Sequence, residues 1–303
     1  MQTIVVAIDR AEGATMGRAE RAFLRSGRSR HALRRAAMLA IEHGMRLDVV
    51  HVTPGPDALG GLLGDALALA ATRARRHLAR LARALAPAPP EVVTRVLHGR
   101  IVPALAEHVA ATLPALIVLG PHLGRPLADL VRRTTAERLV GRVPCPLLVV
   151  KRRPLGSYTS ALVALALDAV DGALLAAQRR FAPAARVTAL HVHDPPLVTR
   201  LVAGDVPVDA VAAFRNRQLD AVGARLRRHL TALGAGHHAP LLRRGKPAHE
   251  ALAVAAGGGH DLIVVGRSGG LVRDVMLGSV SRHLLGRARA DVLIVPRDPG
   301  GVG

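Results

Sequence analysis

The sequence predicts an α/β protein made of two tandem, open, doubly wound sheets, each five-stranded and mostly parallel. Three observations support this prediction. The chain has 303 residues, which suits two domains of about 150 residues each. Its two halves repeat one order of short apolar runs, and the segments between the runs are rich in the helix-favouring residues Ala, Leu and Arg. Strands that alternate with helices indicate a parallel sheet covered on both faces.

The internal repeat defines the expected strands. Each half carries five apolar runs, several of them rich in Val and Ile, and breakers at their ends predict buried strands. The corresponding runs are Ile4–Asp9 and Leu162–Asp168, Asp48–Val52 and Thr188–Val192, those that end at Gly99 and Gly245, Ala115–Gly120 and Asp261–Gly266, and Leu147–Val150 and Val292–Val295.

The segments between these runs predict four helices in each half. A basic stretch with Pro and Gly, Lys151–Ser157, marks the boundary, so we expect half one over residues 1–152 and half two over residues 158–298. The expected helices cover residues 28–43, 62–86, 101–112 and 135–142 in half one, and about 170–182, 208–233, 247–256 and 280–288 in half two.

Composition bounds the environment and the partners. The chain has 42 Lys and Arg residues against 22 Asp and Glu, a net charge of +20 that allows contact with nucleic acid or an anionic surface. The charge is spread evenly over the halves, which favours a solvated basic surface, and one Tyr, three Phe and no Trp argue against base stacking. A single cysteine and the lack of a secretory signal predict a cytoplasmic protein, and no apolar run is long enough to predict a transmembrane segment.

The loop after the fourth strand of half two is the first candidate site. Ligands of such sheets bind beyond the carboxyl ends of the strands, where the strand order reverses. Glycines allow close approach to a phosphate, and free N–H groups at a helix start favour an anion. Asp168 is suited to a ribose hydroxyl or a base edge, and Lys246 offers a cation. The loop carries Gly266, Gly269, Gly270, Gly278, Ser279 and Ser281, whose hydroxyls are also candidate helix caps.

These residues resemble the universal stress protein family, and the whole chain resembles its tandem two-domain form. The family pattern is Gly-x2-Gly-x9-Gly-Ser/Thr after the fourth strand, with Asp ending the first strand and His-Val ending the second. Half two matches it with Asp168, His191-Val192, Gly266, Gly269, Gly278 and Ser279, although the interval from Gly269 to Gly278 is one residue short.

The resemblance implies an adenine nucleotide alpha hydrolase-like fold, often dimeric, and in some members an ATP site. It implies that Asp168 and Val192 contact adenosine, that glycines, with Gly245 among the candidates, and hydroxyls hold phosphates, and that Mg²⁺ accompanies the nucleotide. It also suggests that the two closing strands meet, which would make one chain a pseudo-dimer, with a homodimer as a further possibility.

Half one departs further from the family pattern. Residues 134–150 align without gaps to residues 279–295, and this places Arg133 at Gly278 and Ala136 at Ser281. We therefore expect half one to be degenerate for nucleotide and to serve as a structural partner. Its weaker candidate site residues are Asp9, Val52, Gly120, Gly124 and Thr134.

Other motifs are weaker. Gly266–Gly270 matches a nucleophile elbow in letters, but only 35 residues follow Ser268 and the helix begins near Ser279. No phosphate-binding P-loop motif is present, and His191 and His193 lack the partners of a metal site. Cys145 is expected to be a buried packing residue.

The sequence favours a nucleotide-responsive stress or regulatory protein that binds ATP in half two, acts through an unknown protein partner and performs no chemistry of its own. The alternative is an interaction protein of the same fold with a basic polyanion-binding surface. A third reading is a nucleotide-using enzyme, such as a hydrolase or an adenylyl transferase.

Overall fold

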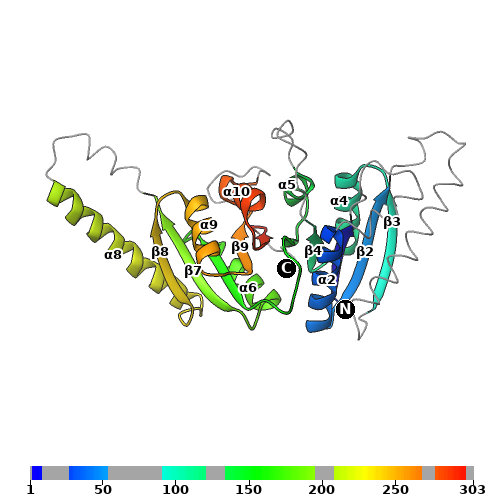
Figure 1. Cartoon of the computed structure of the whole chain (residues 1–303), viewed down its shortest axis with the longest axis horizontal. Coiled ribbons are helices and arrows are strands. Elements are labelled where there is room, and N and C mark those ends of the chain that lie inside the picture. The colour runs from blue at the N-terminus through cyan, green and yellow to red at the C-terminus, as the bar shows by residue number, and fades with distance from the viewer. Residues whose placement is uncertain are drawn as a thin grey trace, which may run out of the picture.

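The computed structural model describes residues 2–8, 27–53, 91–120, 134–194, 208–267 and 277–297. Within these ranges the order of elements follows the predicted repeat (Figure 1). The predicted helix over residues 62–86 lies outside the described residues. In half one the elements are β1 (Thr3–Ile8), α2 (Gly27–Glu42), β2 (Arg46–Thr53), β3 (Val92–His98), α4 (Ile101–Thr112), β4 (Leu116–Leu119), α5 (Thr135–Val140) and β5 (Leu147–Val149).

Half two repeats the pattern, and its described residues include the long helix α8. Each predicted helix of this half is present within a residue or two of its expected ends. The elements are β6 (Ser160–Leu165), α6 (Asp171–Phe181), β7 (Arg186–His193), α8 (Val208–Ala232), β8 (Ala239–Arg244), α9 (Pro247–Gly257), β9 (Leu262–Gly266), α10 (Ser279–Arg287) and β10 (Asp291–Val295).

The two five-stranded sheets join into one. The strand order is β3-β2-β1-β4-β5-β10-β9-β6-β7-β8, and all neighbours are parallel except β5 and β10. These closing strands pair antiparallel, with Leu148 opposite Leu293. Each closing strand would otherwise be an exposed apolar edge, and here the backbone groups of the two edges hydrogen-bond to each other. The prediction that the halves meet at their last strands is confirmed.

Helices cover both faces of the continuous sheet, as the doubly wound class requires. One apolar core lies under α2, α6 and α8, and the other lies under α4, α5, α9 and α10. Alternate residues of a strand serve opposite cores: Ile4 and Val6 of β1 join the first core, and Val5 joins the second. Each core contains residues of both halves, so the two tandem domains pack against each other along the shared sheet.

A buried polar cluster closes the junction between the halves. Asp291 of β10 is 1% exposed, and its Oδ1 accepts the backbone N–H of Lys151 at 2.7 Å. Its Oδ2 accepts the hydroxyl of Tyr158 at 2.7 Å and lies 3.5 Å from Nε of Arg35, which belongs to α2 of half one. The Arg35 guanidinium also lies 3.8 Å from the centre of the Tyr158 ring and donates to the carbonyl of Gly156. One carboxylate thus joins both halves and the connecting segment.

Strand β6 ends earlier than the sequence predicts. The apolar run continues to Leu167, but the strand stops at Leu165, and Leu167 is buried in a turn with a φ of +61°. An apolar run cannot distinguish a buried strand residue from a buried turn residue, and this is the physical reason for the error. None of the helices in the described ranges has both the length and the hydrophobicity that crossing a bilayer requires.

Candidate functional site

A pocket opens at the carboxyl ends of the central strands of half two. Its volume is about 340 Å³, within the range of about 300–1,000 Å³ of small-molecule sites. Strands β6 and β9 are adjacent, and their crossovers go to opposite sides, so this is the point where a doubly wound sheet binds its ligand. The wall is mainly apolar, with Ala164, Leu190, Val192, Ala251 and Val265 among the lining residues.

The pocket brings together most of the site residues predicted in half two. Asp168 and Val192 line it from the ends of β6 and β7, and Gly266 lines it from β9. The start of α10 supplies Gly278, Ser279 and Ser281. Gly269 and Gly270 lie outside the described residues, as do Asp9 and Gly124 of half one.

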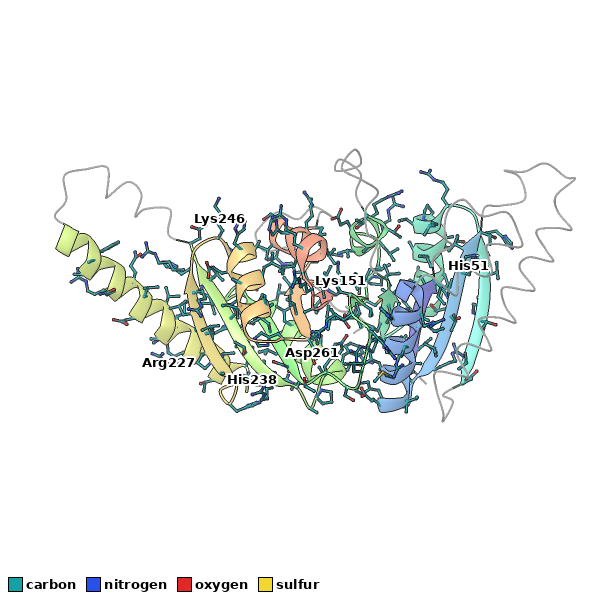
Figure 2. The ribbon with its side chains drawn as sticks, in the orientation of Figure 1. His51, Lys151, Arg227, His238, Lys246 and Asp261 are labelled. Atoms are coloured by element: carbon teal, nitrogen blue, oxygen red, sulfur yellow. The ribbon has the colours of Figure 1, made fainter. Side chains whose placement is uncertain are left out.

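Gly245 does not line the pocket. It follows β8 with a φ of +137°, and its N–H donates to the carbonyl of His193. Gly99 repeats this arrangement in half one, with a φ of +115° and a bond to Thr53. Both are turn glycines that need the left-handed region. Lys246, next to Gly245, is exposed at the end of the sheet where β8 finishes, whereas Asp261 marks the opposite end, before β9 (Figure 2).

The start of α10 is open toward the pocket. Gly278 is the N-cap residue, and no side chain of the described residues caps the first N–H groups of the helix. Ser279 is exposed at the first helical position, while Ser281 is buried and its hydroxyl donates to the carbonyl of Gly266 at 2.6 Å. The expectation that these serines cap the helix is therefore wrong. Because the backbone N–H groups stay uncapped, the helix start suits an anion.

Half one begins the equivalent helix differently. Thr134 is the N-cap of α5, and its hydroxyl accepts the N–H of Glu137 at 3.2 Å. The Glu137 carboxylate in turn accepts the N–H of Thr134 at 3.2 Å, which completes a capping box. The helix start thus already holds a negative charge of its own. Val52 and Gly120 lie at the end of β2 and just after β4.

Register corrects the assignment of the strand-end acid. The Nδ1 atom of His51 bonds to the carbonyl of Ile8, and Nδ1 of His191 bonds to that of Leu165, at 2.9 and 3.0 Å. These matched bonds make Leu165 the counterpart of Ile8, so Ala166 is the counterpart of Asp9. Asp168 lies two residues farther on, where its Oδ1 accepts the N–H of Val170 at 2.9 Å.

Sequence reasoning missed one buried acid of the pocket wall. Asp171 is 0% exposed, lines the pocket and accepts the N–H groups of Ala166 and Leu167. Burial raises the pKa of its carboxyl, and the backbone hydrogen bonds oppose that shift. In the sequence it was visible only as an acid in the first turn of a predicted helix. Among the described residues, no three His, Cys, Asp or Glu side chains are grouped to hold a metal ion.

Comparison with known proteins settles the family. The model of the universal stress protein family matches the chain twice, over residues 1–151 and 158–296. The chain belongs to the universal stress protein family. Its fold is similar to that of a universal stress protein from Archaeoglobus fulgidus, at 15% identity and a TM-score of 0.62, covering 97% of this chain and 98% of that one.

Two solved structures from Pseudomonas aeruginosa resemble this universal stress protein over its whole length. One is described as a universal stress protein, with 17% identity, a TM-score of 0.60, and coverage of 97% of this chain and 93% of that one. The other is described as functionally unknown, with 17% identity, a TM-score of 0.55, and coverage of 98% and 93%. No curated protein sequence gives a significant match.

Proposed function

We propose that half two binds ATP, with Mg²⁺ accompanying it, and that the protein acts as a nucleotide-responsive regulatory protein of the stress response. The observation that carries this proposal is the open start of α10 at the pocket, with Gly278 and Ser279 in its lining. Uncapped N–H groups there would receive phosphate oxygens, and the helix dipole favours the negative charge.

The rest of the pocket suits a nucleoside. Apolar side chains from β7 and β9, including Val192 and Val265, offer a surface for a base, and Asp168 offers an acceptor for a ribose hydroxyl or an exocyclic amine. His191 projects into the same space, with Nδ1 used by the carbonyl of Leu165. Because that carbonyl only accepts, Nδ1 of His191 is the donor of this hydrogen bond.

We propose that the pocket binds nucleotide without catalysing a reaction. Asp171 is the buried acid of the wall, and its carboxylate is already engaged by two backbone N–H groups and by His229. The hydroxyl of Ser281 is engaged by the carbonyl of Gly266. These engaged groups support binding and release of nucleotide as the event that the protein uses.

The test is calorimetric titration of nucleotide-free protein with Mg-ATP. We expect one site per chain, and Gly278→Arg should abolish it, because an arginine side chain would fill the space in front of the helix start. Gly286→Arg is the matched control: it makes the same change in the same helix, where a side chain meets open space. No binding at millimolar ATP, or equal binding in both variants, would remove the proposal.

A second candidate function rests on the basic surface. Arg243 and Arg244 are exposed on the edge strand β8, Lys246 is exposed just beyond it, and the net charge of the chain is +20. Such a surface would hold a polyanion through phosphate contacts, with release of counterions. RNA binding measured at 50 and 200 mM salt tests this candidate: steep loss of affinity supports it, and no binding at the lower salt removes it.

A further inference from the structure

A turn held by one buried carboxylate forms part of the pocket wall. Residues 166–170 connect β6 to α6, and Ala166, Asp168 and Val170 all line the pocket. Asp171 folds back on this turn: its Oδ1 accepts the N–H of Ala166 at 3.0 Å, and its Oδ2 accepts that of Leu167 at 2.8 Å.

The turn is a conformation that needs support. Leu167 has a φ of +61°, a left-handed value that residues with a side chain adopt at a cost in free energy. The consecutive N–H groups of Ala166 and Leu167 both donate to the Asp171 carboxylate, so this carboxylate fixes the path of the backbone. Removal of its charge would leave two N–H groups without an ionised acceptor.

Helix α8 holds the same turn from outside the pocket. Nε2 of His229 lies 2.9 Å from Oδ2 of Asp171, and an ionised carboxylate only accepts, so this ring nitrogen donates. One helical turn earlier, Nη2 of Arg225 donates to the carbonyl of Leu167 at 3.2 Å. None of the described residues that line the pocket belongs to α8. The helix therefore contacts the pocket wall without touching the pocket itself.

We propose that Asp171 and His229 form a positioning pair, which sets the shape of the pocket wall and ties it to α8, so that ligand affinity depends on the pair. The naming of ATP as the ligand rests on the function proposed above. Because this pair and Arg225 bond α8 directly to the turn of the wall, a displacement of α8 would change the wall, and occupation of the pocket would in turn restrain α8.

The pair also makes the wall sensitive to protons. Burial raises the pKa of Asp171, so this carboxyl takes up a proton at a higher pH than an exposed aspartate would. Among the described residues, the charged or titratable groups near it are His229 and Arg225 from α8, Asp168 from the turn, and His191 from β7. A protonated carboxyl loses acceptor capacity, so binding should weaken as the pH falls through this raised pKa.

The experiment uses the full chain and two variants, Asp171→Asn and His229→Gln. Two matched controls make the same changes at exposed positions: Asp220→Asn on α8 and His237→Gln just after it. Mg-ATP is titrated at several pH values between 5 and 8. We expect affinity about tenfold weaker in both variants at pH 7.5, from the loss of hydrogen bonds to a charged group, and native affinity in both controls.

A second readout needs no nucleotide. The amide resonances of Ala166 and Leu167 should move with pH in the native protein as the carboxyl titrates, shift in His229→Gln, and not titrate in Asp171→Asn. If Asp171→Asn does not fold, the His229→Gln variant still tests whether the pair sets the pocket wall. The proposed pair would be overturned by native Mg-ATP affinity in His229→Gln, or by amide resonances of Ala166 and Leu167 that do not move with pH in the native protein. Failure of the native chain to bind Mg-ATP would instead remove the nucleotide function, while the amide titration still tests whether the pair sets the turn.

Discussion

The helix that follows the fourth strand begins in opposite ways in the two halves. In half one, Glu137 and Thr134 cap α5 with their side chains, and a carboxylate lies at the helix start. In half two, α10 has a glycine at its N-cap, and none of the described side chains caps it. The residue aligned with Glu137 is Arg282, which is exposed and donates to the carbonyl of Leu277. A helix start filled by its own anion repels a second one, whereas an open start beside an arginine attracts it.

The difference shows how a duplicated fold divides its roles. The backbone scaffold is the same: five parallel strands, the last of which pairs with the last strand of the other half, and helices on both faces. On the function proposed above, single side chains at matched positions would decide which half receives an anion, since Glu137 caps its helix in half one and Arg282 stands at the aligned position in half two. The prediction that half one serves as a structural partner stays a prediction, and the capping box supplies a physical reason for it.

The closing strands differ in the same manner. Asp291 begins β10 and gathers Lys151, Tyr158 and Arg35, whereas the aligned residue of half one is Pro146, which has no side-chain acceptor. Burial of Tyr158 and the nearby Asp291 raise the pKa of the tyrosine well above its usual value, so its hydroxyl stays a donor. Half two therefore supplies the anion of the junction, and half one supplies the cation.

The largest expected effect comes from removing that cation. Arg35→Met keeps the length of the apolar stem but leaves Asp291 buried without its arginine, and such unpaired burial costs about 3 kcal/mol of unfolding free energy. Urea unfolding measures this loss. Arg34→Met is the control, because the neighbouring side chain is only half-buried on the same helix. Equal losses in the two variants would show that Arg35 does not stabilise the junction through Asp291.

The next effect tests the charge at the helix start directly. Arg282→Glu gives half two the carboxylate that half one already has, and we expect Mg-ATP affinity to fall about tenfold, or about 1.4 kcal/mol. Arg289→Glu changes the net charge equally at an exposed site beyond the other end of α10, so it controls for overall charge. If both variants weaken binding alike, the effect belongs to the net charge, and the comparison of the helix starts fails as an explanation.

A smaller effect concerns the pH dependence of the junction. Burial raises the pKa of Asp291 above its usual value of 3.8. Between the raised pKa and 3.8 the folded chain binds this proton and the unfolded chain does not, so stability from this group grows as the pH falls and is lost as it rises through the folded pKa. The Asp291→Asn variant has no carboxyl at this position, so it lacks this pH-dependent contribution to stability. We expect the stability advantage of the native chain over this variant to widen from pH 7 to pH 4.5.

Urea titrations of both proteins at each pH measure this difference, because contributions from the other groups cancel between them. An advantage that is constant across the range, or that narrows toward acid, would contradict the raised pKa.

Local patterns were enough to predict the elements and the outline of the site. Helix α4 was expected over residues 101–112 and is found over Ile101–Thr112, because its apolar spacing and its flanking breakers are local signals. Gly266, Gly278 and Ser279 were also found by spacing, since a loop and a helix start are adjacent in the chain.

Long-range contacts were beyond such reasoning. The role of Asp171 depends on a bond to His229, 58 residues away, and no periodicity in the sequence indicates it. The displacement of Asp168 by two positions has a similar cause, because only the strand register, fixed by pairing of Leu165 with His191, shows where β6 ends. Side chains that act across elements are therefore the part that sequence reasoning misses.

The smallest expected effect concerns Cys145, whose counterpart in half two is Ala290. Burial raises the pKa of the thiol to about 12, so almost no thiolate exists at pH 8. Iodoacetamide should leave the folded chain unlabelled at pH 8 and label it fully in denaturing urea. Cys145→Ala makes half one match half two at this position and should cost less than about 1 kcal/mol in the same unfolding assay. Rapid labelling of the folded chain would mean that the turn carrying Cys145, just before β5, opens readily. The junction beside it could not then be the rigid one that the Asp291 cluster predicts.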